Sequence, residues 1–399
     1  MAGITGLGTN YNLPNYTGIL FGLTPSETPL FSAIGGLTGG GQSTDTRFEW
    51  QTYDLRTAAQ PEVLEGAAAP TAQGRVRGQV TNVCQIHQEK VSVAYSKIAA
   101  VGKKAGLAND AMNPIRDEVD WQVEQALKQM VRDAEYSFIN GSYQLPVDNT
   151  TGRKTRGLLS AITSTARDAD DWLTALPTTT ATAASDLVNS TAHGLVAGDQ
   201  VIFTSLTGGT GLVVDTVYYV IASGLTANAF KLAATRGGSA IDITVDASAA
   251  TAYKMIALTV DAFYDTLQSV YDNGGLSEQE TNTVIANSSG KRAISNAFAD
   301  AYGKFNETSR NLAGVNVTTI ESDFGRLNIM LNRFVPQHKL IVASLDQLTP
   351  VFLEVPGKGH FFAEPLAKTG ASDDVQLYGE VGLAYGNEKA HGVLSGFAV

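Results

Sequence analysis

The residues that could carry chemistry are few and widely separated in this sequence. A single cysteine, Cys84, lies in a predicted strand, where a small packed thiol is expected rather than a reactive one. No two histidines stand at the spacing of metal ligands, and His87 shares a strand face with Glu89, which predicts a pair at the surface. The five histidines are His87, His193, His338, His360 and His391.

The signatures of the common enzyme classes are missing. There is no GxxxxGKS/T, no GxGxxG after a strand, no GxSxG, no HExxH and no CxxC. The string NSSGKRAIS at 287–295 lacks the first glycine of a phosphate-binding loop. Asp323-Phe324-Gly325 stands without the other motifs of a kinase and predicts a turn, and Asp373-Asp374 predicts a loop that faces water. We therefore expect no catalytic residue, no cofactor, no metal and no enzymatic activity.

Length and composition indicate a folded protein with two or three compact units. The chain has 399 residues, of which 43% are hydrophobic and 17% charged. With 28 Lys and Arg against 39 Asp and Glu, the net charge is −11, and no basic run predicts a surface that tracks phosphates. The acidity serves solubility, or it belongs to a surface that lies near nucleic acid without holding it. Without a signal peptide or a long apolar run, we expect a soluble protein made in the cytoplasm.

The first hundred residues indicate segments that bury little of themselves. Residues 1–44 are rich in glycine yet too apolar for a free tail, so they must dock on their own body or on a neighbouring subunit. From 45 to 100 the pattern is β: Phe48 and Trp50 alternate with polar residues, and a second β run follows after a Gly/Ala/Pro-rich tip. A two-stranded excursion of this kind is expected to find its partners on another chain.

The rest of the chain predicts a long helix and an α+β body interrupted by β structure. A helix is expected from Asn113 to Gly141, because Asn-Pro suits its start and apolar residues follow at helical spacing. Short β runs between 176 and 257 predict a small sandwich or barrel inserted into the body. Beyond 258 helices and strands alternate, with a hairpin around the turn at 323–325.

This order of parts resembles the major capsid proteins of tailed bacteriophages with the Hong Kong 97-type fold. Several strings look like the branch typified by phage SU-ten, and they recur in the same order over most of the chain outside 176–257. These strings are TPLFSAIGG (28–36), FEWQTYDL (48–55), VLEG (63–66), DFGRLNIMLNRFVP (323–336), FFAEPLAKTG (361–370) and GNEKAHG (386–392).

The resemblance implies a division of an α+β chain, with the hairpin around 323–325 in the peripheral sheet and the insert on the outer shell surface. The expected parts are an N-terminal arm (1–44), an extended β loop (45–100), a peripheral domain with the spine helix (101–175), an inserted β domain (176–257), an axial domain with part of the peripheral sheet (258–372) and a C-terminal return to the body (373–399).

By the same resemblance, the chain is a shell subunit that assembles with itself into hexamers and pentamers. The further partners expected are a portal protein, a separate scaffolding protein, a decoration protein on the insert, and packaged double-stranded DNA without sequence-specific contact, with no membrane. The expected location is the virion capsid, after assembly in the host cytoplasm. The candidates for contacts between subunits are Phe21, Phe31, Glu49, Trp50, Glu62, Glu65, Arg75 and Arg77.

Two other functions remain open at this point. An encapsulin-like cargo shell would use the same fold but would form small, uniform shells without DNA. A virion adhesin or fibre protein would use the β structure of 176–257 to bind cells or glycans. Electron microscopy separates both from a phage head.

Overall fold

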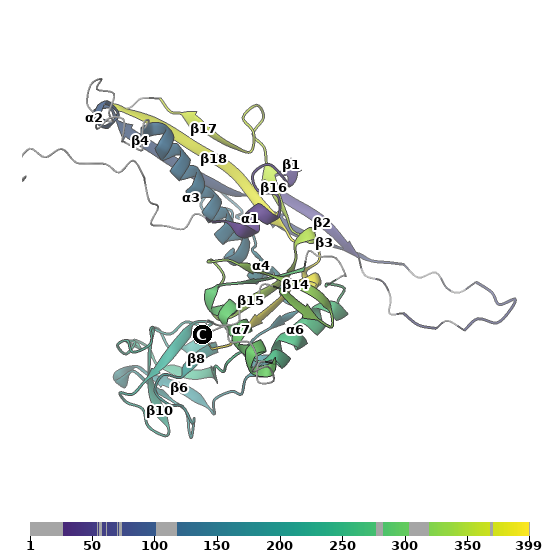
Figure 1. Cartoon of the computed structure of the whole chain (residues 1–399), viewed down its shortest axis with the longest axis vertical. Coiled ribbons are helices and arrows are strands. Elements are labelled where there is room, and N and C mark those ends of the chain that lie inside the picture. Colours follow the sequence, from purple (N-terminus) through teal and green to yellow (C-terminus); the bar gives the residue numbers. More distant parts are fainter. Residues whose placement is uncertain are drawn as a thin grey trace, which may run out of the picture.

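The computed structural model describes residues 27–53, 55, 58–60, 62–69, 71, 74–100, 118–276, 282–302, 319–367 and 370–398. They form two mixed sheets with helices packed against them, a closed β-barrel, and a two-stranded excursion that projects from the body (Figure 1). Phe21 and the expected helix start at Asn113 lie outside the described residues. No helix in the described part of the chain is long and apolar enough to cross a membrane.

The first sheet carries the long helix. Its central strand is β18, which pairs with β16, β17 and β4, while β1 adds to β16 in parallel. Helix α3 lies on β4 and β18 (Figure 1). Helix α3 ends at Asn140, just before Gly141, as predicted. A side chain at position 141 would collide with the carbonyl oxygens of Ser137 and Thr155, so glycine is required there. The bounds are β1 Gly41–Ser43, β4 Gln85–Ala94, α2 Tyr95–Ala100, α3 Glu118–Asn140, β16 Thr349–Leu353, β17 Phe361–Pro365 and β18 Ser372–Ala384.

The second sheet has the strand order β13-β14-β12-β15-β19-β5 among the described residues. Helices α6 and α7 pack against it through a core that includes Phe263, Leu267 and Ile294. The bounds are β5 Ala166–Arg167, α6 Val260–Asp272, β12 Asn282–Ala286, α7 Ser288–Tyr302, β13 Thr319–Ser322, β14 Gly325–Leu331, β15 Lys339–Ser344 and β19 Gly392–Ser395.

The hairpin around the Asp323-Phe324-Gly325 turn is confirmed, but the sheet predicted for it is wrong. Strands β13 and β14 pair with each other, and β14 pairs in parallel with β12 of the second sheet rather than with any strand under α3. The local sequence specifies the turn between β13 and β14. The strand that pairs with the other side of β14 is determined by contacts between residues far apart in the chain.

Residues 179–254 form a closed barrel with the strand order β10-β7-β6-β11-β8-β9. Its interior is a separate apolar cluster that includes Val188, Phe203 and Phe230, each without exposed surface. The chain enters and leaves the barrel side by side, since the Leu176 amide donates to the Ala252 carbonyl at 2.8 Å. The bounds are β6 Thr179–Thr182, η1 Ala183–Ser185, β7 Leu187–Asn189, β8 Gln200–Gly208, β9 Val217–Ile221, β10 Ala229–Ala233 and β11 Ala247–Lys254.

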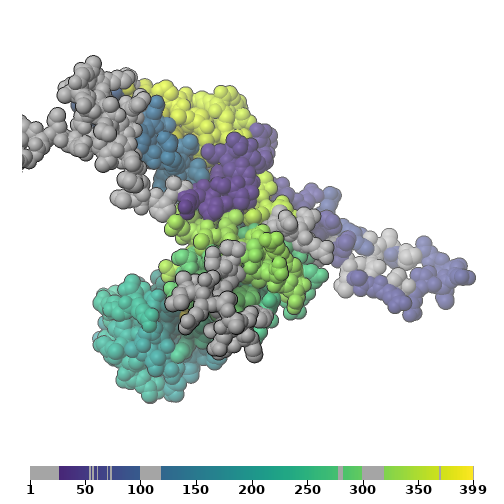
Figure 2. All heavy atoms as spheres, viewed as in Figure 1, coloured from purple at the N-terminus to yellow at the C-terminus, as the bar shows by residue number. Residues whose placement is uncertain are grey.

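The excursion, defined here as the described residues between 47 and 83, is a ribbon of two antiparallel strands. Strand β2 (Arg47–Tyr53) pairs with β3 (Arg77–Val83) residue for residue, and with no other described strand. It projects from the body as a thin arm (Figure 2). Its outer part therefore has neighbours on few sides within its own subunit.

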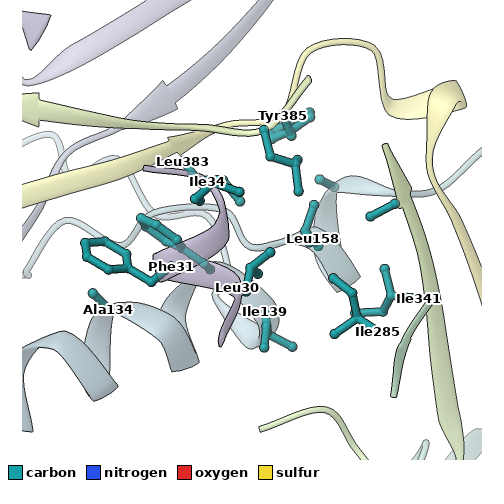
Figure 3. Packing of buried hydrophobic residues seen from close by; sticks show 14 of the residues in the cluster. Leu30, Phe31, Ile34, Ala134, Ile139, Leu158, Ile285, Ile341, Leu383 and Tyr385 are labelled. Carbon is teal, nitrogen blue, oxygen red and sulfur yellow. The ribbon is translucent and has the colours of Figure 1, made fainter. Parts of the chain in front are cut away.

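The short helix α1 (Pro29–Ala33) locks the N-terminal segment into the main core. Leu30, Phe31 and Ile34 pack between α3 and the two sheets (Figure 3). The buried Glu135 carboxylate accepts hydrogen bonds from the Leu30 amide (2.9 Å) and the Phe31 amide (2.6 Å), so α3 caps α1. Of the two docking partners left open by the sequence, the subunit's own body receives this part of the arm. The remaining short elements are α4 Leu158–Ala161, α5 Ala169–Trp172, η3 Leu345–Gln347 and η4 Glu388–Ala390.

Candidate assembly surfaces

The histidines lie apart in the fold as they do in the sequence. His193 Nδ1 accepts from the Leu195 amide at 3.0 Å, and His391 bridges the Ser344 amide and the Tyr385 carbonyl in the core. No group of three or more His, Cys, Asp or Glu side chains suited to a metal ion occurs within the described ranges. The surface pair predicted for His87 is wrong: its ring is buried under α3, and burial lowers its pKa.

Cys84 is a packed thiol, as predicted. It lies between β3 and β4 without exposed surface, and its Sγ is 3.7 Å from the Val351 carbonyl oxygen. Burial raises the pKa of the thiol to about 12, so it stays protonated and unreactive at neutral pH.

Asp374 does not face water, which corrects the prediction for the Asp373-Asp374 pair. It lies at the start of β18, paired with Lys90 Nζ at 2.8 Å and with the Ser92 hydroxyl at 2.6 Å. The hydrogen bonds from Lys90, Ser92 and Ser372 lower the pKa of this carboxyl to about 2. The ion pair between Asp374 and Lys90 therefore connects the neighbouring strands β18 and β4.

Two of the charged candidates at the excursion pair within the ribbon itself. Glu49 accepts hydrogen bonds from Arg47 and from Gln79 across the strand pair. The Arg77 guanidinium donates to the Gln51 side chain at 3.0 Å. Both residues thus stabilise the ribbon as well as offering charge at its surface.

Three further candidates, Glu62, Glu65 and Arg75, lie on the exposed outer part of the excursion. None of them forms an ion pair with another described residue. The Arg75 guanidinium makes a long contact of 3.4 Å with the adjacent Gly74 carbonyl oxygen. These charges are free to pair with another molecule.

The two aromatic candidates in the described chain are engaged in their own subunit. Phe31 is 2% exposed and packs against Phe138, with ring centroids 5.7 Å apart. Trp50 donates from Nε1 to the Gly386 carbonyl at 2.7 Å and packs edge-on against Tyr385. Phe31 therefore belongs to the core, and Trp50 anchors the base of the excursion.

The excursion also carries exposed apolar side chains that the sequence did not single out. Val63 is 70% exposed, Leu64 85% and Val76 82%. The signal that could have revealed them is a Val-Leu pair inside a stretch without periodicity, because such residues have no core face to point to. The full set is Tyr53, Leu55, Val63, Leu64 and Val76.

The barrel contacts the body through an apolar cluster and a polar latch. Trp172 packs among residues of both parts, including Ile202 and Met255. Asp215, in the loop before β9, faces His338 Nε2 at 3.2 Å and Lys339 Nζ at 2.5 Å. We call these last three residues the latch, because they join a barrel loop to the start of β15.

The family model for the SU10 major capsid protein matches residues 3–398. No curated protein matches the chain. Among solved structures, the capsid protein in the asymmetric unit of cyanophage A-1(L) is similar over 98% of both chains, with 12% identity and a TM-score of 0.56.

Two other solved structures are similar at lower scores. The capsid protein of a native GTA particle matches 98% of both chains at 12% identity with a TM-score of 0.49. The SrpI encapsulin of Synechococcus elongatus PCC 7942 matches 97% of this chain and 92% of its own at 10% identity, with a TM-score of 0.47. The likeness to the cyanophage protein shows the Hong Kong 97-type fold.

Proposed function

The chain belongs to the SU10 major capsid protein family, and we propose that its copies form the hexamers and pentamers of a phage head that encloses double-stranded DNA. It is a major capsid protein of tailed phages and a component of the virion capsid. We propose that the head assembles in the host cytoplasm, with a portal protein at one vertex and with a separate scaffolding protein. No catalytic step is part of this function.

The excursion is the observation that carries the proposal. A ribbon of two strands is marginally stable alone in water, and this one leaves Val63 and Leu64 exposed at its outer part. Burying such side chains on a neighbouring copy recovers about 1.5–3 kcal/mol for each one fully covered. The ribbon thus gains its missing partners when subunits assemble.

The charged residues of the excursion suit weak and correctable contacts. Glu62, Glu65 and Arg75 are exposed, and exposed ion pairs contribute about 0–1 kcal/mol each. Many such contacts per subunit let a misplaced copy leave before the shell closes. Glu49 and Arg77 add to this surface while holding the ribbon together.

The acidity of the chain suits a container for DNA. A net charge of −11 disfavours phosphate binding, so the wall would not trap the nucleic acid that it encloses. We propose contact with packaged DNA that is independent of sequence.

We propose that residues 176–257 are an inserted domain on the outer surface of the shell, where they stabilise capsomers or receive a decoration protein. The adjacent entry and exit of the barrel and its separate core support this division. The other proposed parts are the N-terminal arm (1–44), the extended β loop (45–100), the peripheral domain with the spine helix (101–175), the axial domain with part of the peripheral sheet (258–372) and the C-terminal return (373–399). Within the 45–100 range, only the residues up to Val83 belong to the excursion, because β4 pairs with β18 in the first sheet.

Electron microscopy of the purified protein, alone and together with its neighbouring virion proteins, tests the shell, with light scattering for its mass. We expect closed angular shells, and at least ten-fold fewer when Val63 and Leu64 are both changed to Asp, because charge at these positions cannot be buried on a neighbour. Val147→Asp, an exposed position outside both the excursion and the barrel, is the control for added surface charge.

The outcomes separate the candidate functions. Normal shells from the double variant would remove the excursion from assembly. Small, uniform shells without DNA would favour a cargo compartment, and a chain that never assembles, even beside its neighbouring virion proteins, would favour an adhesin that uses the barrel.

Excision of the barrel tests the proposed insertion. Deleting residues 176–257 and closing the gap with a short linker should leave a soluble, folded body, because the chain enters and leaves the barrel side by side, with a β-bridge between Ala175 and Tyr253. An insoluble product would show that the barrel and body fold as one unit.

A further inference from the structure

A hollow lies at the base of the excursion, between β3 and the segment that follows β18. Its volume is about 420 Å³, and two cations, Arg156 and Lys389, line it. We call this space the basal hollow. The rest of its wall is rich in hydrogen-bonding side chains, which include Thr52, Gln79, Thr81 and Asn387.

The Arg156 guanidinium is held in position by the residues around it. Its Nη1 donates a hydrogen bond to the Tyr385 hydroxyl at 3.1 Å, and its central carbon lies 4.7 Å from the centroid of the Tyr143 ring. The Arg156 backbone amide also donates to the Asn82 side chain at 2.8 Å. Because the planar group is already oriented, it loses little conformational freedom when it binds an anion.

Neither cation of the basal hollow forms an ion pair with another described residue. Arg156 is partly buried, as Arg153 and Lys339 are, and those two form ion pairs at 2.8 Å and 2.5 Å respectively. Water and salt screen a partly buried charge less than an exposed one. An ion pair at Arg156 is therefore expected to be stronger than one at the open surface.

Glu388 also lines the basal hollow, but its carboxylate is engaged elsewhere. Its Oε2 accepts hydrogen bonds from the Thr163 amide at 3.2 Å and hydroxyl at 2.9 Å, and its Oε1 accepts from the Ser164 hydroxyl at 2.7 Å. Burial raises the pKa of Glu388, but these hydrogen bonds outweigh it, so the pKa lies below its usual value. Two cations against this one carboxylate leave the hollow with an excess of positive charge.

We propose that the basal hollow receives the carboxylate of an Asp or Glu side chain from a neighbouring copy of the chain. Arg156 binds it through the N–H donors that Tyr385 leaves free, and Lys389 adds a second positive charge. The proposal rests on the proposed shell function and names a contact between copies that lies away from the outer part of the excursion.

Charge and geometry favour a carboxylate from a second copy. Each copy has 39 Asp and Glu against 28 Lys and Arg, so the anions that assembly brings to this surface are mainly carboxylates. The two oxygens of a carboxylate match the planar fork of a guanidinium. A DNA backbone is bound by a row of cations, whereas Arg156 and Lys389 share one hollow and the sequence has no basic run.

A carboxylate in the basal hollow acts on the residues that anchor the excursion. The Tyr385 hydroxyl holds Arg156, and the Tyr385 ring packs edge-on against Trp50, with ring centroids 4.9 Å apart. An anion bound to Arg156 therefore immobilises the residues that join β2 to the body. Since the anion comes from another copy, this restraint exists only in the assembled state, and it favours the orientation that the excursion has there.

Reversal of the exposed cation tests the contact without disturbing the core. In assembly without DNA, we expect Lys389→Glu to reduce the yield of sedimenting shells at least ten-fold, with the unfolding temperature of the free subunit unchanged. Arg156→Lys keeps the charge but loses the planar fork, so the yield should fall about three-fold. Arg292→Glu reverses an exposed charge on α7 and is the matched control. Normal shells from Lys389→Glu, or an equal loss from Arg292→Glu, would overturn the contact.

Zero-length cross-linking identifies the partner directly. A carbodiimide joins an amine to a carboxylate in contact with it, so shells assembled from isotopically heavy and light chains should yield Lys389 linked to an Asp or Glu peptide of the other isotope. Lys389→Arg should remove this product and keep the shells.

The remaining outcomes separate this inference from the proposed function. Shells in which Lys389 links only within its own chain, or to nothing, would overturn the inference alone. Lys389→Glu shells that form normally when empty and fail only when DNA is packaged would assign the hollow to a phosphate and overturn the carboxylate. An unchanged protein that forms no shells would overturn the proposed function instead.

Discussion

The barrel and the excursion are both antiparallel β structure, but the barrel leaves no strand edge unpaired, whereas each strand of the excursion has one unpaired edge. The barrel pairs each of its six strands on both sides and encloses its own core, with Phe203 and Phe230 fully buried. The excursion pairs two strands on one side only and leaves Tyr53 73% exposed. Closure makes the barrel independent of its neighbours, and the lack of closure makes the excursion depend on them.

This contrast separates the surface that stabilises a shell subunit from the surface that drives its assembly. Surface that is fully buried within the chain contributes to the stability of the free subunit. Surface left open contributes only when copies meet, so it controls assembly without raising the stability of the monomer. The same kind of substitution should therefore give different effects in the two regions.

The largest expected effect is on stability, from an aromatic side chain in the barrel. Phe230→Ala should lower the free energy of unfolding of the barrel by about 3–5 kcal/mol, because it empties a fully enclosed site. Tyr53→Ala, the matched change on the excursion, should stay within about 0.5 kcal/mol. Urea unfolding followed by circular dichroism measures both. Equal losses of unfolding free energy at the two sites would contradict the view that the excursion adds little to the stability of the free subunit.

Local sequence patterns predicted the positions of helices and turns better than they predicted which strands pair with each other. The turn at Asp323-Phe324-Gly325 and the helix end at Gly141 follow from residues close in the chain, and both are confirmed. The sheet predicted for the hairpin was wrong, because β14 pairs with β12, whose residues lie 45 positions earlier in the chain. Local patterns do not encode that choice.

The candidate contact residues show the same limit. Exposure of Glu62, Glu65 and Arg75 agrees with the loop-like sequence around them. Phe31 was a candidate for contact with another subunit, but its backbone amide is held by Glu135 on α3, more than a hundred residues away. A buried carboxylate that caps a distant helix leaves no signal near the segment that it holds.

A smaller effect is expected where the excursion joins the body. Trp50→Phe keeps an aromatic ring beside Tyr385 but removes the hydrogen bond to the Gly386 carbonyl. The loss should be about 0.5–1.5 kcal/mol, with a wider spread of excursion orientations and slower shell assembly. Thermal unfolding and time-resolved light scattering measure the two consequences. Unchanged kinetics alongside the loss of stability would mean that Trp50 supports the fold alone and does not aim the excursion.

The smallest effect is expected at the latch, where the barrel meets the body. Burial raises the pKa of Asp215, but the hydrogen bond to His338 and the charge of Lys339 outweigh it, so the pKa lies below its usual value. A carboxyl of this kind stabilises the fold above its unfolded pKa of about 3.9 and loses that contribution as the pH falls further. Because its side chain is half exposed, Asp215→Asn should cost less than about 1 kcal/mol at pH 7 and nothing near pH 2.

Asn is a fair replacement at this position, since the backbone φ of Asp215 is +60° and Asn tolerates that region as Asp does. Unfolding of both proteins across this pH range gives the difference directly. A gap that persists at pH 2 would place its origin in the backbone and not in the ion pairs. A gap that closes as the carboxyl protonates would show that the barrel, though closed on itself, is still held to the body by charge.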